Sequence, residues 1–207
     1  MRRVANIFDS PKAWNRFAIF AVVPALLCFC PRTASQSPPL SPVQSDSGKY
    51  LEHLVPFVPT PLDVAQKMLE VAKVQPDDVV YDLGSGDGRI VIMAAQKFHA
   101  DAVGIEIDPD LCRQSLARIA KLGLERNARI IHGDLLAQNY SSADLVTVYL
   151  LPDSINGKVQ PLLDRQLKKG ARVVAHDFEF REWTPDKVQN IADDGEGRSH
   201  TLYLYRK

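Results

Sequence analysis

Residues 79–90, Val-Val-Tyr-Asp-Leu-Gly-Ser-Gly-Asp-Gly-Arg-Ile, constrain the fold of this chain more than any other stretch. The β-branched and aromatic run at 79–83 predicts a buried strand. Gly84, Gly86 and Gly88 follow it, and glycine permits a tight turn and a close approach of the backbone to a ligand. The helix expected next directs its free N–H groups at whatever lies above the turn. Such a turn at the carboxyl end of a parallel strand is typical of a site for a nucleotide-like ligand.

The spacing of the glycines narrows the choice of ligand. Dinucleotide sites use G-x-G-x-x-G and place a pyrophosphate at the helix N-terminus. Here the order is G-x-G-x-G, with Asp82 before the turn and Asp87 within it. Two carboxylates repel a pyrophosphate, so we expect a ligand that carries an ammonium and a sulfonium. An NAD-type Rossmann domain, or a glycine turn without a ligand, is the alternative.

Two further strand ends carry polar residues in the order that such a site requires. The strand expected at 102–107 contains Glu106, about 20 positions after the glycine turn, where a carboxylate binds the hydroxyls of a ribose. The strand expected at 128–132 leads into Gly133, Asp134 and Leu135. We expect Asp134 to accept a hydrogen bond from an adenine amino group and Leu135 to contribute backbone contact.

Strands and helices alternate along the rest of the chain. Helices are expected at 61–73, 89–98, 109–122 and 156–168, and further strands at 143–151, 171–178, 187–191 and 199–205. Thr60 suits an N-cap and Pro61 a first helical position. This pattern predicts an α/β fold, with a mostly parallel, doubly wound, Rossmann-like sheet and an antiparallel C-terminal strand.

Charge and cysteine content exclude several classes of site. Lys and Arg total 25, Asp and Glu total 25, and the formal net charge is zero, so no basic excess indicates a nucleic-acid partner. Of the three cysteines only Cys112 lies in the expected domain, which leaves no internal disulfide and no cysteine-only zinc site. We expect no metal.

Several stretches together resemble one enzyme class. Asp-Leu-Gly-Ser-Gly-Asp-Gly at 82–88 is similar to the first motif of class I S-adenosylmethionine-dependent methyltransferases, and Glu106 matches the acidic end of their second strand. A narrower resemblance is to the family of the ATP synthase c-subunit and adenine nucleotide translocase lysine N-methyltransferases. It covers about residues 50–207 and is carried by 55–61, 82–90, 104–108, 146–152, 170–178 and Trp183.

The resemblance implies S-adenosylmethionine as the cofactor and a seven-stranded methyltransferase fold. Asp82 is then expected at the ammonium, Glu106 at the ribose hydroxyls and Ile107 on the adenine face. The full set of expected cofactor-binding residues is Asp82, Gly84, Ser85, Gly86, Gly88, Glu106, Ile107, Asp134 and Leu135.

The same resemblance implies a protein lysine as the acceptor, with a small membrane protein among the candidate partners. We expect Tyr149 beside the transferred methyl and His176 as a group that orients the amine or accepts its proton. A packing role for Tyr149 and a structural hydrogen-bonded role for His176 are the alternatives. For the whole protein, the alternatives are a small-molecule methyltransferase and a non-catalytic cofactor-binding module.

The sequence of the N-terminal region indicates a targeting segment but does not determine the final compartment of the protein. Basic residues precede an apolar stretch at 17–30, which is short for a spanning helix of about 20 residues. Residues 1–34 are therefore expected to be a cleaved signal peptide or a membrane anchor, residues 35–49 a disordered linker, and residues 50–207 the methyltransferase domain. The protein is expected to be membrane-associated or exported, although S-adenosylmethionine is a cytoplasmic or organellar cofactor.

Overall fold

The computed structural model describes residues 57–207. The expected signal peptide or anchor at 1–34 and the linker at 35–49 lie outside this part of the chain.

Helices and strands alternate through the described region. The main helices are α2 (Leu62–Val71), α3 (Arg89–Phe98), α4 (Pro109–Lys121) and α6 (Gln160–Gln166), with shorter turns η2 (Leu135–Ala137), α5 (Pro152–Ser154) and η3 (Ile155–Val159). The strands are β1 (Val79–Leu83), β2 (Asp101–Glu106), β3 (Ala128–His132), β4 (Leu145–Val148), β5 (Arg172–His176), β6 (Lys187–Ile191) and β7 (His200–Arg206).

The seven strands form one sheet in the order β3-β2-β1-β4-β5-β7-β6. The first five of these are parallel, while β7 pairs antiparallel with both β5 and β6. The predicted mostly parallel, doubly wound sheet with an antiparallel C-terminal end is confirmed. The strand order reverses between β1 and β4, and the carboxyl ends of strands at such a point are where open α/β sheets bind ligands.

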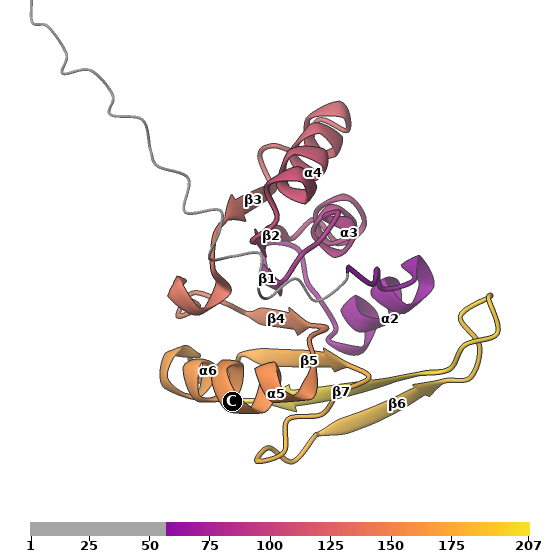
Figure 1. Ribbon diagram of the computed structural model, residues 1–207, viewed down its shortest axis with the longest axis vertical. Coiled ribbons are helices and arrows are strands. Elements are labelled where there is room, and N and C mark those ends of the chain that lie inside the picture. The colour runs from indigo at the N-terminus through magenta and orange to yellow at the C-terminus, as the bar shows by residue number, and fades with distance from the viewer. Residues whose placement is uncertain (1–56) are drawn as a thin grey trace, which may run out of the picture. The chain divides into compact units, whose positions relative to one another are not determined.

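Two hydrophobic cores cover the two faces of the sheet. Figure 1 shows α2, α3 and α4 on one side of the sheet and α5 and α6 on the other. Residues of α2, α3 and α4, including Met68 and Ile119, pack with Val80 on one face. Residues of η3 and α6, including Leu163, pack with Tyr81 on the other. Neighbouring residues of β1 thus point to opposite cores, which explains the unbroken apolar run that marked this strand in the sequence.

Local details differ from the expectations at three places. The expected helix at 156–168 begins earlier, at Pro152, and contains a π-helical segment at 155–159, a feature often found near functional sites. Strand β4 ends at Val148, so Tyr149 lies just beyond it. The prediction that Thr60 caps α2 is wrong: the N-cap is Pro61, and the hydroxyl of Thr60 bonds to His176 instead.

Within residues 57–207, no helix combines the length and the apolar character that crossing a bilayer requires.

Candidate active site

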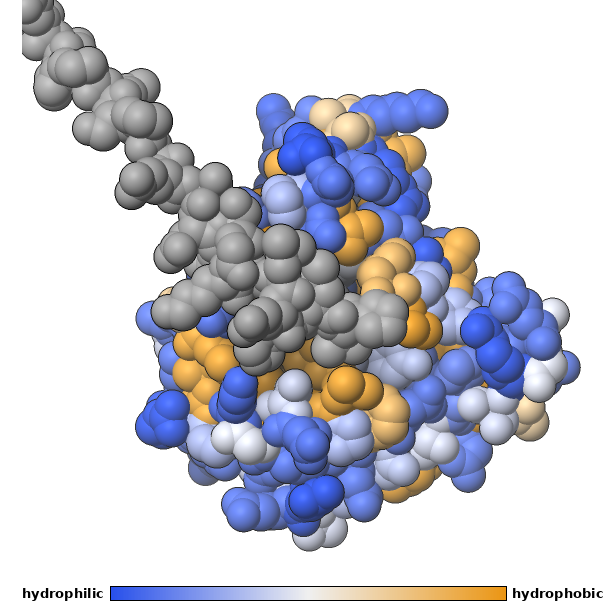
Figure 2. Space-filling model, in the orientation of Figure 1, coloured by the Kyte–Doolittle hydropathy of each residue, from blue (hydrophilic) through white to orange (hydrophobic). Residues whose placement is uncertain are grey.

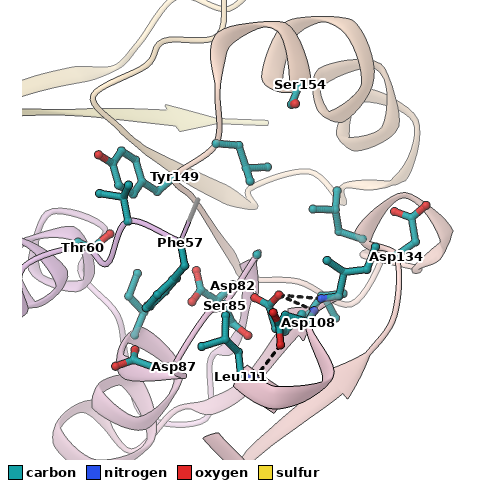
Figure 3. Close-up of a pocket in the computed structure, with 18 of the residues that line it drawn as sticks. Phe57, Thr60, Asp82, Ser85, Asp87, Asp108, Leu111, Asp134, Tyr149 and Ser154 are labelled. Atoms are coloured by element: carbon teal, nitrogen blue, oxygen red, sulfur yellow. Dashed lines mark hydrogen bonds between the residues drawn. The ribbon is translucent and has the colours of Figure 1, made fainter. Parts of the chain in front are cut away.

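A cavity of about 510 Å³ opens at the carboxyl ends of β1, β2 and β4, within the range of about 300–1,000 Å³ that suits small-molecule ligands. In the view of Figure 3, Thr60 and Tyr149 lie at one end of it and Asp134 lies at the other. Seven of the nine expected cofactor residues line it, namely Asp82, Gly84, Ser85, Glu106, Ile107, Asp134 and Leu135. The structure therefore brings these residues together, and their contacts with a cofactor stay predictions.

The glycine turn has the backbone that the sequence predicted. Gly84, Gly86 and Gly88 all adopt positive φ, at 75°, 55° and 74°. Gly86 and Gly88 do not line the cavity. The ring of Phe57 lies over Gly86. A Cβ at Gly86 would stand 2.1 Å from that ring, so only glycine fits beneath it.

Gly104 in the middle of β2 is a site residue that the sequence reasoning missed. A Cβ there would lie 2.4 Å from Ser85 Oγ and 2.7 Å from a methyl group of Ile130. The glycine thus makes room for Ser85 beneath the turn. The available signal was a glycine inside a strand, which marks the close approach of another group.

Glu106 shapes the glycine turn from the neighbouring strand. Its Oε2 accepts a hydrogen bond of 2.6 Å from the Gly86 N–H, and its Oε1 accepts from the N–H groups of Ile107 and Asp108 at 2.9 Å each. Two carboxylate oxygens offer about four acceptor directions, so at least one remains for a ligand hydroxyl. The side chain is almost buried, which makes its charge more effective at short range.

Asp82 lies at the floor of the cavity with one hydrogen-bond partner on a neighbouring strand. Thr147 on β4 donates its hydroxyl to Asp82 Oδ1 at 2.7 Å. Burial, together with the negative charges of Glu106 and Asp87, raises the pKa of Asp82 to about 7. A cationic ligand group beside Asp82 would relieve this penalty, because an opposite charge favours the ionised carboxylate.

Asp87 does not share this role. Arg89 donates to both of its carboxylate oxygens at 2.9 Å, and Arg118 donates to Oδ2 at 2.9 Å. Although burial opposes it, these guanidinium groups hold the pKa of Asp87 below its usual range. Because two arginines already pair with Asp87, Asp82 is the carboxylate of the turn with the weaker pairing and the one that suits a ligand cation.

The opposite end of the cavity has the character of a base-binding pocket. Asp134 Oδ1 accepts a hydrogen bond of 2.8 Å from the Leu136 N–H and so begins the turn η2. The Oδ2 atom of Asp134 takes no part in this hydrogen bond. Ile107, Leu135 and Leu136 supply apolar walls around it.

The two expected catalytic residues lie against each other, but only one reaches the cavity. Tyr149 lines the cavity, and its ring packs on that of His176 with centroids 4.0 Å apart. His176 is completely buried behind Tyr149 and Thr60, with Nδ1 at 3.2 Å from Thr60 Oγ1. A direct contact between His176 and a substrate amine is thus not available in this arrangement.

The raised pKa of Asp82 tests whether the cavity suits a charged ligand. A ligand cation beside this carboxyl favours its ionised form, so the cavity fits a ligand that carries a cation. Ser85 Oγ is also buried without a hydrogen-bond partner among the described residues, but it lies beneath the turn near Gly104 and has almost no accessible surface.

Residues 82–187 match the family of the ANTKMT methyltransferase domain. A protein-lysine N-methyltransferase of Saccharolobus islandicus is 46% identical over 157 residues, which cover 75% of this chain and 95% of that protein. The human lysine N-methyltransferase of the ATP synthase c-subunit is 35% identical over 65% of this chain, and the chain spans 56% of its length.

The comparison with solved structures includes a relative whose sequence identity to this chain is close to that of the Saccharolobus protein. The crystal structure of an RNA methyltransferase from Salinibacter ruber, in complex with S-adenosyl-L-homocysteine, has a TM-score of 0.65 and 45% sequence identity. It covers 72% of this chain and 93% of that chain. The acceptors for which these relatives are named thus differ, with protein lysine in two of them and RNA in the third.

Proposed function

This chain belongs to the ANTKMT methyltransferase family, and from that membership we propose that it transfers methyl groups from S-adenosylmethionine to a lysine side chain of a protein. The observation that carries the proposal is the 46% identity over nearly the whole length of a protein-lysine N-methyltransferase. The expected methyltransferase class, its cofactor and its lysine acceptor, which the sequence indicated, are all supported by this match.

The residues present fit the cofactor at both ends of the cavity. Asp82 would hold the ammonium, Glu106 the ribose hydroxyls and Asp134 the adenine amino group, and all three line the cavity. When bound, S-adenosylmethionine supplies a methyl group on a sulfonium, an already activated donor.

The protein's own contribution is to position and desolvate the acceptor. Methyl transfer needs the amine in line with the donor, and correct placement alone lowers the barrier substantially. Tyr149, at the end of the cavity beside Thr60, presents an aromatic face on which a lysine stem can pack. Burial, and then the charge of Asp177, raises the pKa of the Tyr149 hydroxyl, so this group stays protonated and does not act as a base.

We further propose that the acceptor lysine belongs to a membrane protein. Large apolar side chains are exposed where the cavity opens: Phe57, Val58 and Ile107 line it, and Leu151 follows a lining residue in the chain. In the view of Figure 2, several hydrophobic residues lie together on the visible surface of the described part of the chain, and hydrophilic residues prevail toward its edges. The relative named for the ATP synthase c-subunit and the apolar stretch at 17–30 support the same class of partner and a membrane-associated location.

The experiment labels acceptors without choosing one in advance. The 207-residue chain is incubated with methyl-tritiated S-adenosylmethionine and either a membrane extract or total RNA, and products are then treated with protease or with ribonuclease. The proposal predicts label in the membrane extract that protease removes and ribonuclease does not. Label on RNA would favour the activity for which the Salinibacter relative is named, and label in neither macromolecule would favour a small-molecule acceptor.

A matched variant separates this activity from contaminants. Glu106→Ala removes the expected ribose contact, so labelling must fall with it at limiting donor concentration. Arg113→Ala alters an exposed residue of α4, outside the cavity, and must leave labelling unchanged.

A further inference from the structure

A chain of hydrogen bonds leads from the cavity wall to the loop between β6 and β7. Thr60 Oγ1 lies 3.2 Å from His176 Nδ1, and His176 Nε2 lies 2.9 Å from His200 Nδ1. His200 Nε2 in turn lies 3.2 Å from Asp194 Oδ2. All four side chains are buried, and Thr60 alone among them lines the cavity. The chain thus connects the acceptor end of the cavity with groups on the far side of His176.

When His200 is neutral and donates to Asp194, the hydrogen atoms in this chain run in one direction. Burial alone would raise the pKa of Asp194, but hydrogen bonds from the backbone of Glu196 and Arg198, from His200 and from the Arg198 guanidinium hold it well below its usual range. An ionised carboxylate only accepts, so His200 Nε2 carries a hydrogen. A neutral His200 then accepts at Nδ1.

The rest of the chain follows from that assignment. His176 Nε2 must donate to His200 Nδ1, which leaves His176 Nδ1 to accept the hydroxyl hydrogen of Thr60. Every donor therefore points away from the cavity. A line of donors with one direction is the arrangement through which a proton entering at Thr60 is passed outward.

His200 lies between two carboxylates, one near each ring nitrogen. Asp177 Oδ2 lies 2.9 Å from His200 Nδ1, while Asp177 Oδ1 accepts from the Thr201 N–H at 2.9 Å. With a neutral His200, two lone pairs face each other across the first of these contacts. A second proton on His200 turns it into a charge-assisted hydrogen bond, with a carboxylate on each side of the imidazolium.

Asp177 is held in place for this contact at a conformational cost. Its φ of 60° lies in the left-handed region, which non-glycine residues enter rarely, although aspartate does so more often than most. Its side chain is 25% exposed, whereas that of His200 is 8% exposed. Asp177 therefore provides the path from His200 to water.

Of the groups that line the cavity, the Tyr149 side chain lies beside Thr60 (Figure 3). Tyr149 stays protonated, because burial raises the pKa of its hydroxyl. The carboxylates that line the cavity hold hydrogen bonds of their own, namely Asp82, Asp87, Glu106, Asp108 and Asp134. A lysine ammonium has an ordinary pKa of about 10.4 and must lose a proton before it can accept a methyl group.

We propose that the path from Thr60 through His176 to His200 is a proton relay that takes the proton of the acceptor ammonium out of the cavity; this rests on the proposed lysine methyltransferase function. The N–H bond of the ammonium breaks as its proton forms a new O–H bond on Thr60. The previous hydroxyl hydrogen passes to His176 Nδ1, and the Nε2 hydrogen of His176 passes to His200 Nδ1. The Nδ1–H bond of His200 then breaks as the proton forms an O–H bond on Asp177 Oδ2, and Asp177 releases it to water.

His176 passes a proton along this path and does not hold an additional proton itself. Burial, and to a lesser extent the neighbouring His200, lowers the pKa of His176 to about 4, against the opposing charge of Asp177. A doubly protonated His176 is thus short-lived. These residues are positioning residues, because only Thr60 would touch the acceptor.

The test compares two substitutions of Thr60 with one of His200. Single-turnover methyl transfer to a membrane extract is measured with the 207-residue chain from pH 7 to pH 9.5. Thr60→Val is expected to slow transfer on the order of a hundredfold at pH 7, the size typical of lost acid–base assistance. The deficit must shrink as the pH rises, because the acceptor then arrives neutral. Thr60→Ser keeps the hydroxyl and is expected to retain the rate, and His200→Gln is expected to behave like Thr60→Val.

The controls separate the relay from structural damage. Thr201→Val removes a hydroxyl next to His200 that bonds only to Asn190, and it must leave the rate unchanged. Affinity for S-adenosylmethionine, measured by calorimetry, must stay the same in every variant. If His200→Gln does not fold by circular dichroism, the Thr60 pair decides alone.

Two results would overturn the relay. One is a deficit that does not change with pH, or Thr60→Ser as slow as Thr60→Val. The other is activity that a chelator abolishes and zinc restores, since the facing atoms of His176, Asp177 and His200 would then be ligands of a cation. If the unaltered chain transfers no methyl group to protein, the proposed function fails instead, and the two failures are thereby distinguished.

Discussion

The substitution Asp82→Asn removes a buried carboxyl whose ionisation works against folding in the absence of cofactor. The pKa of Asp82 is raised from 3.8 to about 7, mainly by burial. Between these values the folded protein binds more protons than the unfolded chain, so the free energy of unfolding falls as the pH rises. For this group alone the loss between pH 5 and pH 8 is roughly 2–3 kcal/mol.

Asn at this position keeps the shape and the acceptor for Thr147 but does not titrate. Urea unfolding without cofactor is measured at pH 5, 6, 7 and 8. Asp82→Asn is expected to gain stability relative to the unaltered chain, and the gain must grow by roughly 2–3 kcal/mol over this range. Asp87→Asn is the control and is expected to lower the free energy of unfolding, because arginine contacts hold the pKa of Asp87 below its usual range.

The same carboxyl gives cofactor binding a pH dependence. Binding of an ammonium requires ionised Asp82, so calorimetry must show tighter binding of S-adenosylmethionine at pH 8 than at pH 5, with proton release near pH 7. Asp82→Asn must weaken binding at pH 8 and remove this dependence. A stability difference that stays constant with pH, or unchanged binding in the variant, would refute the reasoning.

Three further substitutions test other parts of the site. Glu106→Ala is expected to weaken S-adenosylmethionine binding by roughly 1.5–3 kcal/mol, the size of a charge-assisted hydrogen bond, and unaltered calorimetric affinity would contradict the ribose assignment. Gly86→Ala is expected to lower the melting temperature, because its Cβ would meet the Phe57 ring at 2.1 Å and its φ is positive; Phe57→Ala in the same chain must restore part of the loss. Tyr149→Ala is expected to cut turnover while calorimetry shows nearly unchanged cofactor affinity, and equal turnover in single-turnover assays would show that the ring only packs.

Features that depend on neighbouring residues were predictable from the sequence. The β1 strand, the glycine turn and the acidic end of β2 are local patterns, and the structure assembles them at one edge of the sheet. The antiparallel end was also predictable, because 187–191 and 199–205 are short strands separated by a turn-forming loop. These elements required only residue preferences and the usual handedness of α/β connections.

Features that depend on distant pairs were not predictable. Thr60 reads as an N-cap in the sequence, yet its hydroxyl bonds to His176, 116 positions away. The contact of Asp87 with neighbouring Arg89 is within reach of a sequence argument, but Arg118 lies 31 positions on and contacts the same carboxylate from α4. For Thr60 a tertiary contact overrides a local preference, and in both cases no pattern within a short window contains the distant partner.

The chemical identity of the methylated group tests the proposed function most directly. Protein from a membrane extract, labelled by the 207-residue chain with methyl-tritiated S-adenosylmethionine, is hydrolysed to amino acids and separated by chromatography. We predict that the label elutes with methylated lysine and that Glu106→Ala reduces it. Label that elutes with another amino acid, or that stays entirely in nucleic acid, would contradict a lysine methyltransferase.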